Sequence, residues 1–90
     1  MANDLKQYRG RVSKALFDSM CDKQYGLMDP PQQPRVAMRM YLCYGYSQKD
    51  AAHYSGVSLP LVNRYLKRFA DLYSRVQKIA PLIDDDVNPR

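Results

Sequence analysis

SQKDAAHYSGVSLPLVNRYL, residues 47–66, is the stretch that decides the fold of this 90-residue chain. Ser47 and Asp50 have the spacing of a capping box, in which the hydroxyl and the carboxylate each accept a hydrogen bond from a backbone N–H that the start of a helix leaves unpaired. A helix is therefore expected to begin directly after Ser47. Ala51 and Ala52 favour helix and are small enough to let a second helix cross closely over the first.

A turn and a second helix follow in the same stretch. Gly56 can adopt a positive φ without steric cost, which predicts a turn at the end of the first helix. Ser58 is a suitable N-cap, and Pro60 falls in the first turn of the next helix, where no intrahelical N–H is needed. The pattern predicts a helix-turn-helix within an all-α fold, a small helical domain with a long C-terminal helix.

The second helix has two faces at helical spacing. The inward face is predicted to comprise Val57, Val62, Tyr65 and Leu66. The outward face is predicted to comprise Ser58, Leu59, Pro60, Asn63, Arg64 and Lys67. One face can therefore pack on the domain while the other contacts a partner.

The outward side chains have the chemistry of major-groove recognition. Arg64 has a planar fork that matches the two acceptors of guanine, and Asn63 can pair with adenine. The apolar Leu59 and Pro60 can touch a thymine methyl group. The side chains of Lys49, Lys67 and Arg68 are better suited to contact phosphates than bases. The alternative is an ordinary solvated face of charged residues, which the preceding turn makes the weaker interpretation.

The positive charge of the chain is concentrated on the same segment. The formal net charge is +5, and residues 35–68, with six Lys or Arg and one Asp, account for +5. Residues 1–34 come to +1, from five basic and four acidic residues, and residues 69–90 come to −1, from three basic and four acidic residues. Such a local field attracts polyanions without encoding sequence, so it favours nucleic acid over an acidic protein.

The length allows one small domain, which buries only a little over ~60% of its unfolded surface. Oligomerisation is therefore expected to add stability. The sequence contains no run of eighteen apolar residues and no charged-then-apolar amino terminus. Neither a membrane span nor a secretory signal is predicted, and a cytoplasmic location is expected.

The two cysteines have neither metal-ligand spacing nor the density of a disulfide framework. Cys21 and Cys43 lie 22 residues apart without a CxxC motif, and His53 is the one histidine of the sequence. Both are interpreted as buried or idle thiols, since a free cysteine is commonly a small core hydrophobe. No metal ligand, cofactor, small-molecule effector or catalytic residue is predicted, because no second ligand and no paired nucleophile and base accompany His53.

The amino-terminal part is predicted to be a helix followed by a linker. Residues 4–24 are expected to form an amphipathic helix, with Gly10 as a weak point. Its apolar stripe comprises Leu5, Tyr8, Val12, Leu16 and Met20. Prolines at 30, 31 and 34 break helix, so residues 26–34 are predicted to be a linker. The amino-terminal helix and this linker together make up residues 1–34, and a DNA-binding domain follows over residues 35–83.

A short helix is predicted to brace the motif from about Arg35 to Cys43, and to end near Gly45. Its inward residues are predicted to be Val36, Met40 and either Cys43 or Tyr44. Tyrosines also crowd the region around the first motif helix, at positions 41, 44, 46 and 54. Half-buried packing with exposed hydroxyls is their expected role, and stacking on unpaired bases is the alternative.

A heptad seam runs through the C-terminal segment. Its members recur at alternating spacings of three and four: Val62, Tyr65, Phe69, Leu72, Val76, Ile79 and Ile83. The seam is equally consistent with an amphipathic helix that closes the core and with a dimer contact through Leu72, Val76 and Ile79, and it could serve both. Pro81 is expected to end or kink the helix, and the acidic tail over residues 84–90 is expected to fray.

Residues 35–86 resemble the PapB family, regulators of fimbrial adhesin operons in enteric bacteria. The likeness lies in Arg35-Val36, in the Gly45-x-Ser47-x-Lys49-acidic entry to the motif, in Leu66-x-Arg68, and in the helix end from Arg75 to Pro81 with acidic residues after it. Gly56, Pro60 and Arg64 differ from the family pattern. The resemblance implies a small oligomeric protein that occupies AT-rich double-stranded DNA cooperatively and activates or represses transcription. It implies DNA contacts by Arg35, Lys49, Arg64 and Arg68.

The sequence therefore predicts a transcriptional regulator without enzymatic activity, which binds double-stranded DNA as a dimer or higher oligomer. A second, weaker resemblance is to TrfB-type plasmid repressors, and it rests on Ala51-Ala52 and Gly56-Val57-Ser58. Another alternative is an accessory factor that holds a polymerase or recombinase subunit through its tyrosines. The DNA-binding end of a transposase or recombinase is a third, and the absence of an acidic triad or an arginine-surrounded nucleophile argues against it.

Overall fold

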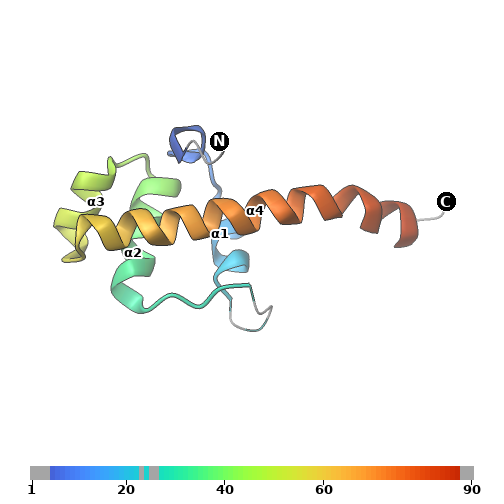
Figure 1. Cartoon of the computed structure of the whole chain (residues 1–90), viewed down its shortest axis with the longest axis horizontal. Helices are drawn as coiled ribbons and strands as arrows, with labels where there is room; N and C mark the ends of the chain where they lie inside the picture. Colours follow the sequence, from blue (N-terminus) through green and yellow to red (C-terminus); the bar gives the residue numbers. More distant parts are fainter. Residues whose placement is uncertain (1–4, 23, 25–26, 88–90) are drawn as a thin grey trace.

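Helices make up the regular structure of the chain in the computed structural model, which describes residues 5–22, 24 and 27–87, with side chains up to residue 79. The 3-10 helix η1 (Leu5–Tyr8) and the short helix α1 (Lys14–Met20) come first. They are followed by α2 (Gln32–Leu42), α3 (Gln48–Ser55) and the long helix α4 (Leu59–Val87). No strand occurs among the described residues, and Figure 1 shows α4 running across the other helices and beyond them. The predicted all-α class with a long C-terminal helix is confirmed.

The helix boundaries around the glycine turn follow the local sequence signals. Ser47 is the N-cap of α3, and its hydroxyl accepts a hydrogen bond of 3.0 Å from the N–H of Asp50, which is the hydroxyl half of the predicted capping box. Gly56 ends α3 in the left-handed region, at φ 75°, and donates to the carbonyl of Ala52. The hydroxyl of Ser58 accepts from the N–H of Leu61 at 3.4 Å at the start of α4. Each of these predicted positions is confirmed.

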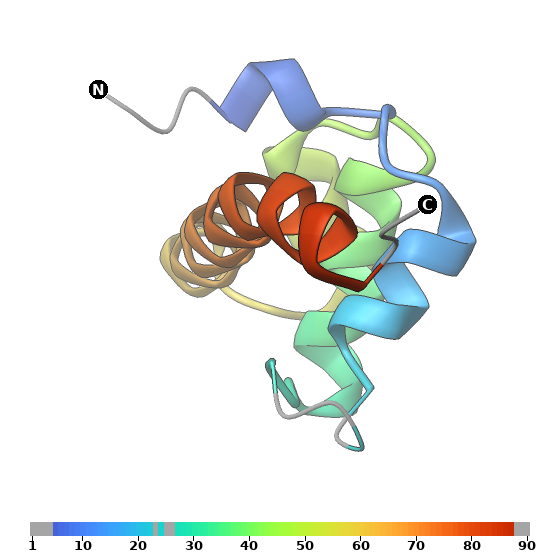
Figure 2. The ribbon, with the colours of Figure 1, turned by 90° about the vertical axis from the view of Figure 1, so that its right-hand side faces the viewer.

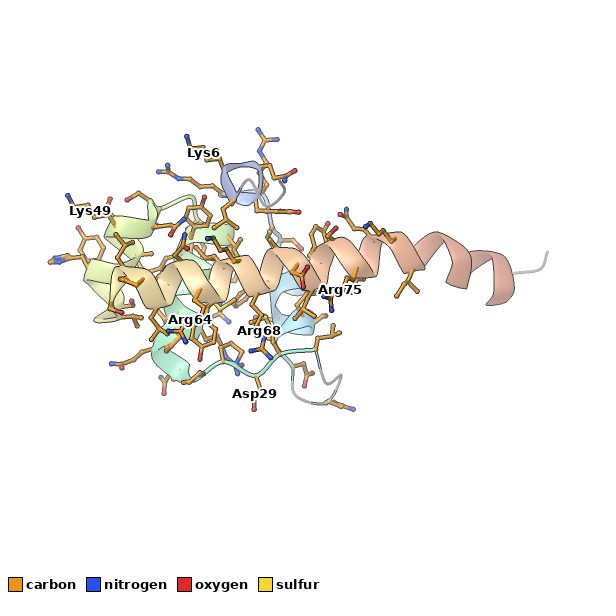
Figure 3. The ribbon with its side chains drawn as sticks, in the orientation of Figure 1. Lys6, Asp29, Lys49, Arg64, Arg68 and Arg75 are labelled. Carbon is orange, nitrogen blue, oxygen red and sulfur yellow. The ribbon has the colours of Figure 1, made fainter. Side chains whose placement is uncertain are left out.

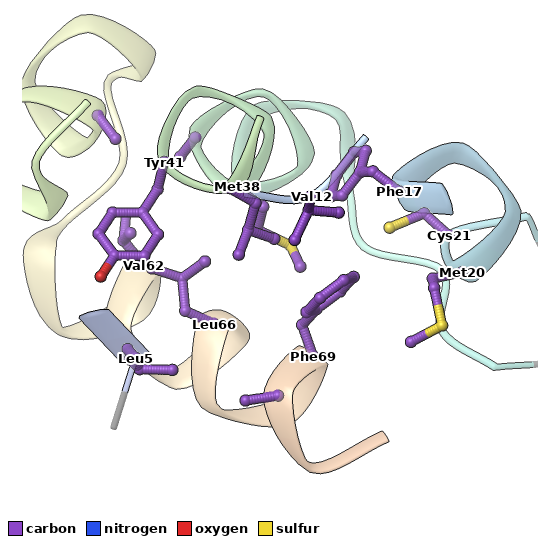
Figure 4. Close-up of a cluster of buried hydrophobic side chains, with 14 of the residues drawn as sticks. Leu5, Val12, Phe17, Met20, Cys21, Met38, Tyr41, Val62, Leu66 and Phe69 are labelled. Atoms are coloured by element: carbon purple, nitrogen blue, oxygen red, sulfur yellow. The ribbon is translucent and has the colours of Figure 1, made fainter. Parts of the chain in front are cut away.

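The core forms where α4 crosses α2 and α3. Val62, Leu66 and Phe69 of α4 are fully buried, and they lie among side chains of α1 and α2 such as Phe17 and Met38 (Figure 4). Burying one such side chain contributes ~1.5–3 kcal/mol. Figure 2, which looks along α4 from its C-terminal end, shows the other helices arranged around one side of it. This packing fixes the N-terminal half of α4 and leaves its other side exposed.

The close crossing of α3 depends on the two predicted alanines. Ala51 is fully buried and Ala52 is 8% exposed, because α3 packs against both α2 and α4 at these positions. A larger side chain at either position would push the helices apart, at a typical cost of ~1–3 kcal/mol. The alanines therefore set the distance between the two motif helices.

The prediction of one helix over residues 4–24 is wrong, because the chain breaks at Gly10. Gly10 adopts φ 67°, and its N–H donates to the carbonyl of Tyr41 at 2.9 Å. The N–H of Val12 donates to the carbonyl of Leu42 at 3.0 Å. These carbonyls lie in the last turn of α2, where a helix leaves carbonyls to be satisfied from outside, and the amino-terminal segment donates to them from a non-helical conformation.

The apolar stripe of this segment nevertheless faces the core. Leu5, Val12 and Met20 are buried, and the two other predicted members, Tyr8 and Leu16, are partly buried against the same core. Phe17 was not in the predicted stripe and is fully buried. The amino-terminal segment and the motif helices thus contribute to a common core on both sides of the predicted boundary at residue 34.

The predicted start and inward face of the bracing helix are also corrected. Helix α2 begins at Gln32, where the N-cap is Pro31, and not near Arg35. Val36 is 41% exposed and Tyr44 is 54% exposed, while Met40 and Cys43 are only partly buried. The buried residues of α2 are Pro34, Ala37, Met38, Tyr41 and Leu42. Both sets have helical spacing, but α2 packs against α1 on one side and α3 and α4 on another, which buries the second set.

Helix α4 continues through Pro81 to Val87. Of the two effects predicted for Pro81, an end or a kink, the end of the helix is therefore wrong. The backbone is helical up to residue 87 within the segment predicted to fray, and residues 88–90 lie outside the described part. Proline removes its own N–H from the helix ladder, and its ring crowds the carbonyl four residues earlier. The carbonyl that this leaves unpaired belongs to the exposed Gln77, where water can reach it.

Candidate nucleic-acid interface

The N-terminal half of α4 presents the outward face that the sequence predicts. On the inward side, Val57 just before α4 is buried, as are Val62 and Leu66 within it, and Tyr65 is partly buried. The exposed residues are Ser58, Leu59, Pro60, Arg64, Lys67 and Arg68. Asn63, the remaining residue of the predicted outward face, is partly buried beside α3. We call Ser58–Pro60, Asn63, Arg64, Lys67 and Arg68 the α4 face.

The cations of the α4 face are not neutralised within the described part of the chain. The side chains of Arg64, Lys67 and Arg68 make no ion pair or hydrogen bond with any described residue. Asp71, the acid nearest along α4, pairs instead with Arg75 at 2.9 Å. Unpaired, exposed guanidinium and ammonium groups keep their donors available for an anionic partner.

The basic residues of the motif lie on both sides of α4. Figure 3 shows Arg64 and Arg68 one turn apart on one side of the helix, and Lys49, near the start of α3, on the other side in this view. Lys49 is exposed. Exposed cations therefore lie on α3 as well as on α4, and each can donate hydrogen bonds to an anionic group.

Arg35, which the family resemblance implies as a DNA contact, is used inside the protein. Its guanidinium donates to the carboxylate of Asp29 and to the carbonyl of Pro30, both at 3.0 Å. The side chain is 34% exposed. These bonds hold the proline-containing linker against the start of α2, so Arg35 has a structural task that Arg64 and Arg68 lack.

Asn63 is held by a residue that the sequence reasoning missed. Its Nδ2 donates to the side-chain Oε1 of Gln48 at 3.1 Å, and the bond is partly buried. Gln48 is the first residue of α3 and lies 15 positions earlier in the chain. No local pattern marks such a pair, because only the crossing of α3 and α4 brings the two amides together.

A second exposed surface surrounds the loop before α3. We call Tyr44, Tyr46 and Tyr54 the tyrosine face; these rings are 54%, 41% and 67% exposed. The rings of Tyr46 and Tyr54 meet edge to face with centroids 6.1 Å apart. Two residues of the amino-terminal segment join this surface: Lys14 Nζ lies 6.0 Å from the ring centroid of Tyr44, and Arg9 Nε donates to the carbonyl of Gly45 at 2.7 Å.

The predicted oligomerisation residues divide between the core and the surface. Leu72 and Val76 are partly buried and pack against the core of their own chain, whereas Ile79 is 50% exposed. An apolar cavity of about 350 Å³ lies beside Val76, lined also by Leu16, Ser19, Met20 and Leu27. The described residues therefore leave apolar surface uncovered on the part of α4 from Leu72 to Ile79.

Both cysteines are packed in the fold, with Cys21 buried and Cys43 partly buried. Burial raises the pKa of Cys21 to about 11, from an ordinary value of 9.0, and burial also raises the pKa of Cys43. Among the residues with described side chains, 5–22, 24 and 27–79, no three His, Cys, Asp or Glu residues group as metal ligands would. In the same part of the chain, no helix combines the length and the apolar character needed to cross a membrane.

Comparisons with protein-family models, with curated proteins and with solved structures return no match for this chain.

Proposed function

We propose that this protein is a transcriptional regulator that binds double-stranded DNA through the α4 face, as a dimer or higher oligomer. The observation that carries the proposal is a helix packed on the core by one face, which follows a glycine turn and exposes the unpaired side chains of Arg64, Lys67 and Arg68. An α-helix fits the major groove, and an arginine fork matches guanine there. Arg64 is the candidate for base contact, while Lys49, Lys67 and Arg68 are candidates for phosphate contact.

The charge distribution supports DNA as the partner. Residues 35–68 account for a net charge equal to that of the whole chain. Each phosphate contact by a lysine or arginine releases condensed counterions, so binding should weaken steeply with salt. We place the protein in the cytoplasm with its DNA, and its similarity to fimbrial operon regulators favours AT-rich sites and a role as activator or repressor.

We expect oligomerisation because a single helix-turn-helix contacts only a few base pairs. One recognition helix touches few base edges, so useful affinity requires several linked copies. The exposed Ile79, and the apolar cavity beside Val76 three residues earlier on α4, offer a contact surface on each chain. Binding to duplexes with two sites about one helical turn apart, ~10 bp, should then be cooperative and tighter than binding to one site.

An accessory factor for a polymerase or recombinase is the second candidate. The tyrosine face favours it, because exposed aromatic rings beside basic groups are typical of protein interfaces. The two functions differ in one measurable respect. An accessory factor that acts through the tyrosine face has no need of salt-dependent affinity for bare duplex DNA.

Selection of bound duplexes from a random DNA pool tests the proposal, followed by titration of the selected duplex at several salt concentrations. We expect an enriched site and a logarithm of the association constant that falls linearly with the logarithm of salt concentration. No enrichment, and no binding at low micromolar protein in low salt, would contradict the proposal and favour the accessory factor.

A further inference from the structure

The α4 face contains one side chain that is already held in place before any partner binds. Arg64 is exposed and unpaired, whereas Asn63 beside it donates from Nδ2 to Oε1 of Gln48 at 3.1 Å. Both members of this pair are partly buried, so water competes less for their bond than it would on an open surface. The two neighbouring residues therefore enter an interface with different conformational freedom.

We propose that Gln48 is a positioning residue that fixes the amide of Asn63 to select adenine at one position of the DNA site. The inference rests on the proposed function and names a residue that sets its specificity. Gln48 itself need not touch a base. Its effect is transmitted through the orientation of the Asn63 amide.

The hydrogen-bond inventory of the Asn63 amide supports adenine as the base. The NH₂ group has two donors, and the bond to Gln48 uses one of them. The second N–H and the carbonyl oxygen Oδ1 stay available. Adenine offers N7 as an acceptor and N6–H₂ as a donor in the major groove, which matches this pair, whereas guanine offers two acceptors.

The placement of Gln48 is fixed by the elements at both ends of the bond. It is the first residue of α3, directly after the Ser47 cap, so its backbone is held at the start of the helix. The buried Ala51 and Ala52 keep α3 close to α4. An amide held in this way loses less side-chain freedom on binding than a freely rotating one, and the saved entropy appears as selectivity for the base that it fits.

The test compares base preference at each position of the selected duplex for variants of this pair. Asn63→Ala should lower the preference for adenine at one position by ~5- to 150-fold. Gln48→Ala should lower the preference at that same position by ~3- to 10-fold and leave the other positions unchanged. The variant with both substitutions should behave as Asn63→Ala alone, because the effect of Gln48 passes through Asn63.

Gln48→Glu is the conservative variant that separates positioning from a structural role. Its carboxylate still accepts a hydrogen bond from Nδ2, so the adenine preference should persist, while the added negative charge weakens binding to all sequences. Gln77→Ala, an exposed glutamine farther along α4, is the matched control and should change neither preference nor affinity. Circular dichroism melting of each variant establishes that it is folded.

The possible outcomes separate this inference from the proposed function. If the parent chain selects a site and Gln48→Ala keeps its adenine preference, or loses affinity equally at all positions, the positioning role is overturned while DNA binding stands. If the parent chain binds no duplex, both the positioning role and the proposed function are overturned.

Discussion

Replacing Gly10 by alanine is expected to destabilise the fold by about 1–5 kcal/mol. At φ 67° a residue with a Cβ atom costs roughly 1–2 kcal/mol. The new Cβ would also lie 3.1 Å from Cα and 3.4 Å from N of Gly45. Both are backbone atoms, so the contact is relieved only by moving the chain, which adds about 1–3 kcal/mol at overpacked sites. The lower entropy of the unfolded alanine chain offsets about 0.4–1 kcal/mol.

Two other glycines provide matched controls for this prediction. Gly56 has φ 75°, and a Cβ there would meet nothing within 4 Å. Gly45 has φ 82°, and its added Cβ would lie at an ordinary contact distance of 3.8 Å from Cα of Gly10. Gly56→Ala and Gly45→Ala therefore incur only the conformational cost and should destabilise by about 1 kcal/mol each.

Urea unfolding followed by circular dichroism measures the three variants on one scale. The loss of stability should be largest for Gly10→Ala, because its displacement also breaks the 2.9 Å bond from its N–H to the carbonyl of Tyr41 at the end of α2. If Gly10→Ala were no less stable than Gly56→Ala, the close contact between the amino-terminal segment and the loop after α2 would be refuted.

Three further predictions concern the surface and the thiols. Lys49→Ala should weaken binding to all duplexes alike and reduce the salt slope by about one, as salt titrations can measure; a change confined to one sequence would contradict its assignment to phosphate. Ile79→Asp should give a folded, helical monomer with weaker DNA binding, because Ile79 is half exposed; sedimentation and circular dichroism test this, and a folded variant that stays oligomeric would exclude a contact through this residue. Burial raises the pKa of Cys21 to about 11 in the folded chain, so the protonated thiol stabilises the fold below its unfolded pKa, near 9.0, and this contribution is lost as pH rises from 9.0 to about 11. Urea unfolding across this range should show a steeper loss for the parent than for Cys21→Ala, and equal slopes would show that the thiol is not linked to folding.

Local signals were enough to predict the motif helices. Ser47, Gly56 and Ser58 each act within four residues of the backbone group that they cap or turn, and all three occupy the predicted positions. The inward and outward faces of α4 also follow from spacing alone. Here the hydrophobic pattern has one dominant phase, because the apolar residues of the α4 face, Leu59 and Pro60, are confined to the first turn of the helix.

Long-range contacts account for what the sequence did not predict. The break at Gly10 depends on the carbonyls of Tyr41 and Leu42, about 30 residues later in the chain, which hydrogen-bond the amino-terminal segment. The inward face of α2 was misjudged because two sets of apolar residues share helical spacing, and only packing against three neighbours selects between them. The bond between Gln48 and Asn63 likewise exists only once α3 crosses α4.

The measurement that tests the central claim most directly is the affinity of Arg64→Ala for the duplex that the parent chain selects. Arg64 is exposed and unpaired on the α4 face, so its loss should lower specific affinity by about 1–3 kcal/mol without changing the melting temperature. Arg75→Ala is the control, because Arg75 lies farther along α4 and already pairs with Asp71 at 2.9 Å, and its affinity should match that of the parent. Equal affinity of Arg64→Ala and the parent for the selected duplex would contradict DNA recognition by the α4 face.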